Sequence, residues 1–407
     1  MKYLSYLPRR VRWTVPAAIL AATGGLLAGS AIPSAAAAPR LPVRSASQLL
    51  AAATGTAAEP PLSGTITETA ALGLPALPGA GALGAGAPVS AASLLAGSHT
   101  VQVWYAGPEH FRLALPQSMS EDDLVRNGTS AWLWDSSANT VTHLTLPASA
   151  PAPPVPAVPL TPQQAARQAL AQAGPTSTVR VDSNVTVAGQ PAYQLVLAPK
   201  SHRSLIGQVR IAIDSRHRVP LRVQVFGRGA ASPAAQVGFT SVSFTRPPAA
   251  DLAFIPPAGA TVTQQHIGNG AVAGAGRLAS GLANGVRVIG TGWLAVAELP
   301  ESSLAALAGA ALPGGPGGSD VIPFRYSSHS QAPGSAAHGG AGHPSNPAAG
   351  SPLFGALLNS AHPVSGSWGS GRLLRTSLMS ILVTSGGRVL IGAVTPGVLY
   401  QAATRAK

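Results

Sequence analysis

The sequence predicts an α+β protein: an antiparallel sheet whose apolar face is covered by helices, followed by a small C-terminal α+β module. Many segments alternate apolar and polar residues with a period of two, which is typical of strands that bury one face. Turn signals join many of these segments as hairpins. A parallel sheet would need a helix between most strands, and the sequence offers only one clear helical interruption.

Composition limits the classes of protein to which the chain can belong. The chain has 407 residues, of which 46% are apolar and 10% charged, so it can build a core and is not a fully disordered protein. Its length suggests two folded units with linkers. The absence of Cys excludes disulfides, Cys-ligated zinc, thiol catalysis and a lipid anchor on an N-terminal Cys.

The N-terminus, residues 1–38, has the layout of a secretory signal peptide. A basic start is followed by a nearly uncharged apolar run, 13–32, and by small residues in an A-x-A pattern at 34–38. Cleavage after Ala36 or Ala38 is expected. The alternative is an uncleaved N-terminal membrane anchor, because the run is long enough to span a bilayer. Either reading places the protein outside the cytoplasmic membrane, in the cell envelope or secreted.

Export changes how the formal net charge of +13 is interpreted. Nucleic acid is the usual partner of a basic chain, but an exported protein is not expected to bind it. Seven cations crowd one stretch: Lys200, Arg203, Arg210, Arg216, Arg218, Arg222 and Arg228. They could contact an anionic membrane surface, or they could form a solvated strand face.

The first predicted elements are a short helix and a strand, followed by a long loop. Ser45 caps a short helix through Ala53, and Leu62–Leu72 reads as a strand. Residues 74–97 form a long apolar loop of low complexity. Its G-x-G-x-x-G at 79–84 is a chance match, because the neighbouring prolines exclude the strand and helix that a dinucleotide fingerprint needs.

A run of antiparallel strands is predicted over His99–Leu146. Asn127-Gly128 is a hairpin turn that joins Asp122–Arg126 to Thr129–Asp135. Another turn, Ser136–Asn139, leads into Thr140–Leu146. Residues 147–160 form a Pro/Ala spacer.

A helix opens at Thr161, where Pro162 fits the first turn and Gln164 completes a capping box. Strands resume after Gly174-Pro175, and the alternation of the last one slips between Phe239 and Val242, as at a bulge. The segments expected as strands are 179–187, 193–198, 207–214, 220–226 and 236–244. Leu62–Phe244 therefore holds about nine strands.

The C-terminal third reads as a second unit, residues 285–405, after a linker at 263–284. A strand is expected at Gly285–Leu299 and a final helix at Val398–Arg405. Gly386-Gly387 signals a hairpin turn. The remaining expectations are helices at 301–312 and 353–361, a disordered loop at 313–350, and strands at 366–376, 378–384 and 388–394.

Catalytic and metal sites are not indicated. The sequence has no G-x-S-x-G elbow, no H-E-x-x-H and no P-loop. His338 and His343 lie in a Gly-rich stretch that cannot preorganise metal ligands. Glu121-Asp122-Asp123 is the only acidic cluster, and adjacent carboxylates on a strand point to opposite faces. We therefore expect no enzyme, no cofactor and no metal.

Four segments carry a resemblance to a known family. They are Ser47–Ala53 with the following strand at Leu62, the hairpin Val125–Asp135, the strands Ala192–Leu197, Val209–Asp214 and Val219–Val223, and the segment Asp251–Ala260. Together they resemble the LolA-like superfamily of exported lipoprotein carriers, above all its actinobacterial, RseB-like members. The resemblance covers residues 45–262. The 74–97 loop, the 147–160 spacer and the C-terminal module depart from the simple carriers.

The resemblance implies a curved antiparallel half-barrel, closed by helices, whose concave face holds lipid or lipoprotein acyl chains without catalysis. An apolar, preformed cavity is what such a ligand needs. The alternative is an RseB-like sensor that binds a membrane anti-sigma factor or another envelope protein. Each candidate groove residue could instead be ordinary core. The candidates are Trp104, Phe111, Leu113, Trp132, Trp134, Tyr193, Leu195, Val209, Ile211, Val223, Val225 and Phe239.

Overall fold

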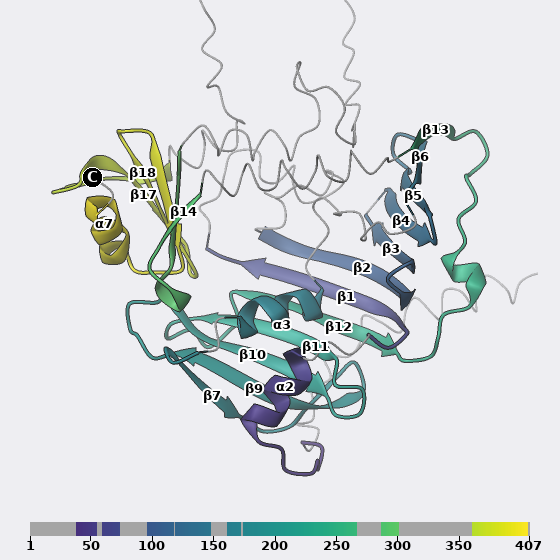
Figure 1. Ribbon diagram of the computed structural model, residues 1–407, viewed down its shortest axis with the longest axis horizontal. Coiled ribbons are helices and arrows are strands. Elements are labelled where there is room, and N and C mark those ends of the chain that lie inside the picture. Colours follow the sequence, from purple (N-terminus) through teal and green to yellow (C-terminus); the bar gives the residue numbers. More distant parts are fainter. Residues whose placement is uncertain are drawn as a thin grey trace, which may run out of the picture. The chain divides into compact units, whose positions relative to one another are not determined.

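The computed structural model describes residues 38–54, 59–73, 96–117, 119–147, 161–171, 174–266, 286–300 and 360–405 (Figure 1). The chain divides into two units, Met1–Ala38 and Pro39–Lys407. The predicted leader, most of the 74–97 loop, most of the 147–160 spacer, the 301–312 helix, the 313–350 loop and nearly all of the 353–361 helix lie outside the described residues. Within those residues, none of the helices has both the length and the apolar character to cross a bilayer.

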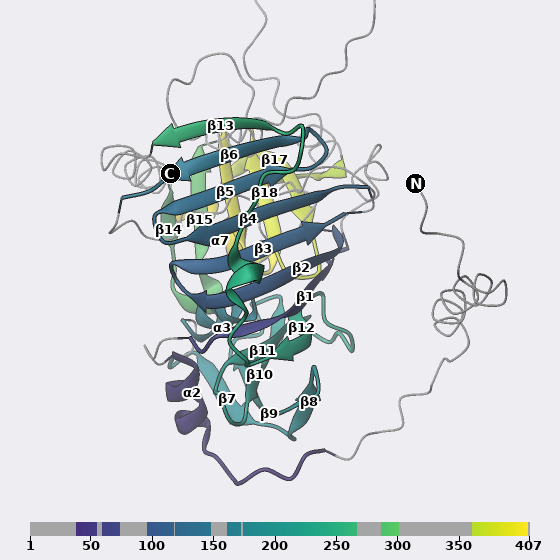
Figure 2. The ribbon, with the colours of Figure 1, turned by 90° about the vertical axis from the view of Figure 1, so that its right-hand side faces the viewer.

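One large sheet dominates the described chain (Figures 1 and 2). It has 13 strands, in the order β13-β6-β5-β4-β3-β2-β1-β12-β11-β10-β9-β7, with β8 paired to β9. The order ends at β13 and β7, so the sheet is open and not a closed barrel. Its strands are β1 (Leu62–Ala71), β2 (Ala96–Gly107), β3 (His110–Pro116), β4 (Glu121–Asn127), β5 (Ser130–Asp135), β6 (Thr140–Thr145), β7 (Ser177–Val181), β8 (Val185–Val187), β9 (Gln190–Pro199), β10 (Ile206–Asp214), β11 (Pro220–Gly227), β12 (Ala235–Ser243) and β13 (Thr261–His266).

Three features of this sheet differ from the sequence prediction. It is mixed, because β13 runs parallel to β6 while the other pairs are antiparallel. Leu62–Phe244 holds twelve strands, not about nine, and the segment expected as one strand at 179–187 is divided into β7 and β8. Strand β13 also extends into residues 263–266, which the sequence analysis assigned to a linker.

A second sheet has six antiparallel strands, in the order β14-β15-β19-β18-β17-β16. The single strand expected at 285–299 is instead β14 (Arg287–Ile289), the 3-10 turn η4 (Gly292–Leu294) and β15 (Val296–Pro300). The strand is broken because Gly290 and Gly292 take positive φ values of 83° and 57°. The other elements are β16 (His362–Gly366), β17 (Gly369–Arg375), β18 (Ser380–Thr384), β19 (Arg388–Gly392) and α7 (Pro396–Arg405).

Two helices lie on the large sheet, α2 (Ala46–Thr54) and α3 (Pro162–Leu170). The predicted capping box of α3 is confirmed, since Gln164 N donates to Thr161 Oγ1 at 3.2 Å and Thr161 N donates to Gln164 Oε1 at 3.2 Å. Helix α2 begins the same way, with Gln48 N donating to Ser45 Oγ at 3.2 Å. The described chain is nevertheless mainly β, with α2, α3 and α7 as its α-helices.

Turns and irregularities occur close to where the sequence predicts them. The β4–β5 hairpin exists, but its two-residue loop is Gly128-Thr129, one position later than expected. Gly128 has φ +61° while Thr129 stays at negative φ, which fits a turn with Gly at its first central position. The predicted bulge is confirmed: Thr65 pairs with Ser241 and Ile66 with Phe239, so Thr240 is the extra residue.

Candidate functional site

The helix face is the face of the large sheet against which α2 and α3 pack. Helix α3 buries Pro162, Ala166 and Leu170, spaced four residues apart, so one stripe of the helix meets the sheet. Both helices make their main contacts with β7, β9, β11 and β12. Leu195 and Ile211 beneath them are fully buried. This half of the helix face is a packed core.

Strand register divides the twelve predicted groove residues between the two faces. Directly paired residues point to the same side, as Leu195, Ile211 and Val223 do across β9, β10 and β11. Eight lie in, or pack against, the core on the helix face: Leu113, Tyr193, Leu195, Val209, Ile211, Val223, Val225 and Phe239. Phe111 shares that face further along the sheet. Trp104, Trp132 and Trp134 lie on the opposite face.

Seven apolar side chains continue the helix face beyond that core, and we call them the apolar patch. They are Val101, Phe111, Leu115, Leu124, Ala131, Leu133 and Leu144, from β2 to β6. All are buried except Leu133, which is partly buried. The main sheet contacts of α2 and α3 lie elsewhere. The described chain thus presents a second apolar area, about four strand spacings or ~19 Å wide, on the same face.

An aromatic and charged cluster occupies the opposite face of β2–β6. Trp132 stacks on His143 with ring centroids 3.8 Å apart and lies 5.6 Å from Phe254. Phe254 follows η3 (Ala249–Leu252), which contacts β3 and β4 (Figure 2). The sequence pattern does not separate this face from the helix face, because alternation alone gives both faces the same signal.

Within this cluster, Arg112 Nη2 donates to Asp123 Oδ2 at 2.6 Å and lies 3.5 Å from Glu121 Oε1. Burial raises the pKa of Asp123 to about 6, although the charge of Arg112 opposes the shift and the charge of Glu121 adds to it. Three buried polar atoms here have no hydrogen-bond partner among the described residues: Arg112 Nε, Asp123 Oδ1 and Trp134 Nε1. The sequence could not reveal the ion pair between Arg112 and Asp123, because the two residues lie on different strands, β3 and β4.

The basic stretch is largely occupied by contacts within the chain. Arg228 donates to Ser201 O at 2.8 Å and to Ser204 O at 3.0 Å. Arg210 lies over the ring of Phe226, 4.8 Å from its centroid. Lys200 donates to Pro175 O at 2.8 Å. These contacts give several of the cations a role inside the chain, and contact with a membrane surface stays a prediction.

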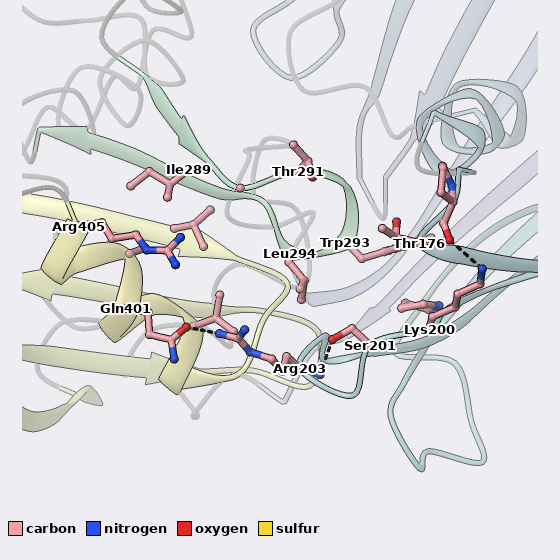
Figure 3. A pocket seen from close by; sticks show the side chains of 16 residues that line it. Thr176, Lys200, Ser201, Arg203, Ile289, Thr291, Trp293, Leu294, Gln401 and Arg405 are labelled. Carbon is pink, nitrogen blue, oxygen red and sulfur yellow. Dashed lines mark hydrogen bonds between the residues drawn. The ribbon is translucent and has the colours of Figure 1, made fainter.

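A cavity of about 490 Å³ lies between the β9–β10 loop, the β14–η4 segment and α7 (Figure 3). Its cations are Lys200, Arg203 and Arg405, and its apolar wall includes Leu294, Val296 and Val398. The residues come from three distant parts of the sequence, so no local motif could have predicted it. We call it the basic cavity.

In the part of the chain that the structure describes, no group of three or more His, Asp or Glu side chains is placed to hold a metal ion. The two histidines His338 and His343 that the sequence analysis considered lie outside that part.

Comparisons with known proteins give structural likenesses only. Neither a protein family nor a curated protein matches the sequence. Pseudomonas aeruginosa MucB, solved with MucA, shares 13% identity, with 88% of this chain and 95% of that chain covered and a TM-score of 0.36. A LolA superfamily protein of Nitrosomonas europaea shares 11%, covering 52% and 99%, at a TM-score of 0.20. An uncharacterised Thermus thermophilus protein shares 12%, covering 54% and 97%, at 0.28.

The chain is therefore structurally similar, at low identity and low TM-score, to MucB and to LolA superfamily proteins.

Proposed function

We propose that this protein acts outside the cytoplasmic membrane as a non-catalytic carrier of lipid or lipoprotein acyl chains, which it holds on the apolar patch. The observation that supports the proposal is the extent of the helix face. Its apolar side chains run from the core beneath α2 and α3 across β2–β6, whereas the two helices mainly contact β7, β9, β11 and β12.

Six of the seven side chains of the patch are already buried and Leu133 is partly buried, so an acyl chain would bind here by replacing the groups that now cover them. Apolar area left in water is unfavourable by about 25 cal/mol per Å², so the face is stable only when it is covered. An acyl chain can supply such a cover, at about 0.8 kcal/mol for each buried methylene. The side chains of the patch are uncharged: Leu124, Leu133 and Leu144 are aliphatic, and Phe111 is aromatic. Two charged residues share the face with them, since Arg126 pairs with Phe111 and Asp122 pairs with Leu115.

Native mass spectrometry of the chain from Pro39 onward tests this function. The protein is purified from a membrane-containing host, and any bound molecule is extracted with solvent. We expect a co-purifying lipid or acylated peptide, and saturable uptake of a fluorescent fatty acid by the stripped protein. Leu133→Glu places a charge in the partly buried centre of the patch and should reduce uptake at least about tenfold.

Ile255→Glu is the matched control, because it adds the same charge at a side chain that is 84% exposed. Its uptake should equal that of the unsubstituted protein. Leu133→Asn provides a milder second variant if Leu133→Glu does not fold, as judged by circular dichroism. Equal uptake by the Leu133 and Ile255 variants would contradict binding at the patch.

A clean apo mass without fatty-acid uptake would reject the acyl-chain proposal. It would favour the alternative that the patch covers a segment of an envelope protein, as an anti-sigma factor would provide for an RseB-like sensor. MucB has been solved in complex with MucA, which gives a precedent for a protein partner in a similar fold.

A further inference from the structure

The basic cavity combines positive charge with an apolar wall. Lys200, Arg203 and Arg405 are its charged residues, and its described lining includes no Asp or Glu. Arg203 donates to Gln401 Oε1 through Nη2, and its other guanidinium N–H groups have no described partner. Arg405 makes no hydrogen bond or ion pair with a described residue. All three cations are exposed, and the lining holds no carboxylate to balance their charge.

Helix α7 places apolar and basic residues along one line of the cavity. Val398, Gln401, Ala402 and Arg405 are spaced at i, i+3, i+4 and i+7, so they share one helix face. Arg203 meets this face at Gln401, and Arg405 lies one turn further on (Figure 3). One guanidinium group, that of Arg203, therefore meets the middle of the α7 face, and the other, that of Arg405, lies at its C-terminal end.

The walls of the basic cavity are fixed by backbone pairing. Leu205 N donates to Ala393 O at 2.9 Å, and Thr395 N donates to Arg203 O at 2.8 Å. The backbone of Arg203 is thus held against the segment that leads into α7. Polar groups mounted on paired backbone lose little freedom when they bind a ligand.

We propose that the basic cavity binds a single-chain anionic amphiphile, with Arg203 and Arg405 holding the anionic group and Leu294, Val296 and Val398 contacting the alkyl chain. We expect the ligand to be anionic because three cations line the cavity and no acidic residue does. Guanidinium groups suit phosphate and carboxylate oxygens. The carbonyl end of α7 repels an anion, so the guanidiniums and not the helix backbone must hold it.

The size of the cavity, about 490 Å³, lies within the range of small-molecule sites. This site is separate from the apolar patch, and the proposal does not depend on the acyl-carrier function. A small free anion would use only the cations, whereas an amphiphile would also use the apolar wall. That difference allows the two to be distinguished.

Isothermal titration calorimetry on the chain from Pro39 onward tests the proposal, with dodecyl phosphate below its micelle concentration as the probe. All titrations use the Leu133→Glu background, in which the apolar patch should no longer take up an alkyl chain, and there we expect saturable binding of one molecule per chain. Arg405→Gln and Arg203→Gln should each weaken it about tenfold, and Leu294→Gln should weaken it by a similar factor through the apolar wall. The matched control Arg216→Gln removes one exposed Arg outside the cavity and should leave binding unchanged.

Two further probes separate the sources of affinity. Inorganic phosphate should bind at least about tenfold more weakly than dodecyl phosphate, because it cannot use the apolar wall. Dodecyltrimethylammonium should not bind in the cavity. Fatty-acid uptake by the apolar patch should be the same in Arg405→Gln as in the unsubstituted chain, so a failure of one proposal does not imply a failure of the other.

Four results would overturn the proposal. They are the absence of saturable binding, equal loss in Arg405→Gln and Arg216→Gln, equal affinity for inorganic phosphate and dodecyl phosphate, and tight binding of the cationic amphiphile.

Discussion

Trp293 Nε1 donates a 2.6 Å hydrogen bond to Ser177 Oγ, and both side chains are buried. Trp293 lies in η4, just before β15 of the second sheet, whereas Ser177 begins β7 at the edge of the large sheet. The indole also belongs to the hydrophobic core of the large sheet. One side chain therefore anchors the start of the C-terminal module by apolar burial and by a hydrogen bond.

Substitutions of Ser177 and of Trp293 should each destabilise the chain, and their effects on the free energy of unfolding should not be additive. Ser177→Ala leaves the buried indole N–H without its partner, which costs about 1–3 kcal/mol, whereas Trp293→Phe removes the donor. In a double-mutant cycle measured by urea unfolding, we expect a coupling energy of about 1–2 kcal/mol. A coupling energy near zero would show that the hydrogen bond contributes nothing measurable.

Asp123 should make stability depend on pH. Its folded pKa of about 6 lies above its ordinary value of 3.8 because the carboxyl is buried. The folded state therefore binds the proton more tightly than the unfolded state. The stability that this contributes is present in full below about pH 4 and is lost as pH rises through the window from about 4 to about 6. The loss amounts to about 3 kcal/mol at most.

Asp123→Asn supplies the comparison, because the amide cannot titrate. The free energy of unfolding of the original chain, minus that of the variant, should fall between pH 4 and pH 6 and stay level above pH 7. Urea unfolding at four pH values measures it. If the unfolding free energies of the two chains changed with pH in parallel, Arg112, whose Nη2 lies 2.6 Å from Asp123 Oδ2, would keep the carboxylate charged throughout the range.

Local signals explain which parts of the fold the sequence could predict. Thr161 and Gln164 are three residues apart, and the capping box they form needs no other part of the chain. The bulge at Thr240 was visible because it breaks an alternation within one strand. The parallel pairing of β13 with β6 was not visible, since it joins Thr261 to Thr140, which are 121 residues apart in the sequence.

The candidate site shows the same limit. Alternation placed Trp132 and Trp134 on one side of β5 and Ala131 and Leu133 on the other, but it could not say which side meets the helices. The predicted groove set therefore combined residues of both faces. The basic cavity depends on loops and a helix that meet only in the folded chain, and the sequence alone holds no sign of it.

The cap of α3 offers a prediction of stability that is independent of any ligand. Thr161→Ala removes the oxygen that accepts from Gln164 N, so it should lower the free energy of unfolding by about 1 kcal/mol. Gln168→Ala, at an exposed position of the same helix, is the control and should change stability by less than about 0.5 kcal/mol. Thermal unfolding followed by circular dichroism compares the two, and equal values would argue against the cap.

Gly64 is the position where a single added carbon should be most damaging. A Cβ there would overlap the backbone oxygen of Ser241 on β12, beside the bulge. Because that atom belongs to a paired strand, it cannot move aside without breaking the register that joins β1 to β12. Gly64→Ala should therefore lower the free energy of unfolding by at least about 2 kcal/mol.

Gly397→Ala is the matched control, because nothing lies within 4 Å of its added Cβ, and no positive φ is found there. It lies in α7, where Ala is a better helix former than Gly, so stability should stay the same or rise by about 0.4–1 kcal/mol. Urea unfolding of both variants measures the two changes in the free energy of unfolding. If Gly64→Ala were as stable as Gly397→Ala, strands β1 and β12 would have to pack less closely at this bulge than the structure describes.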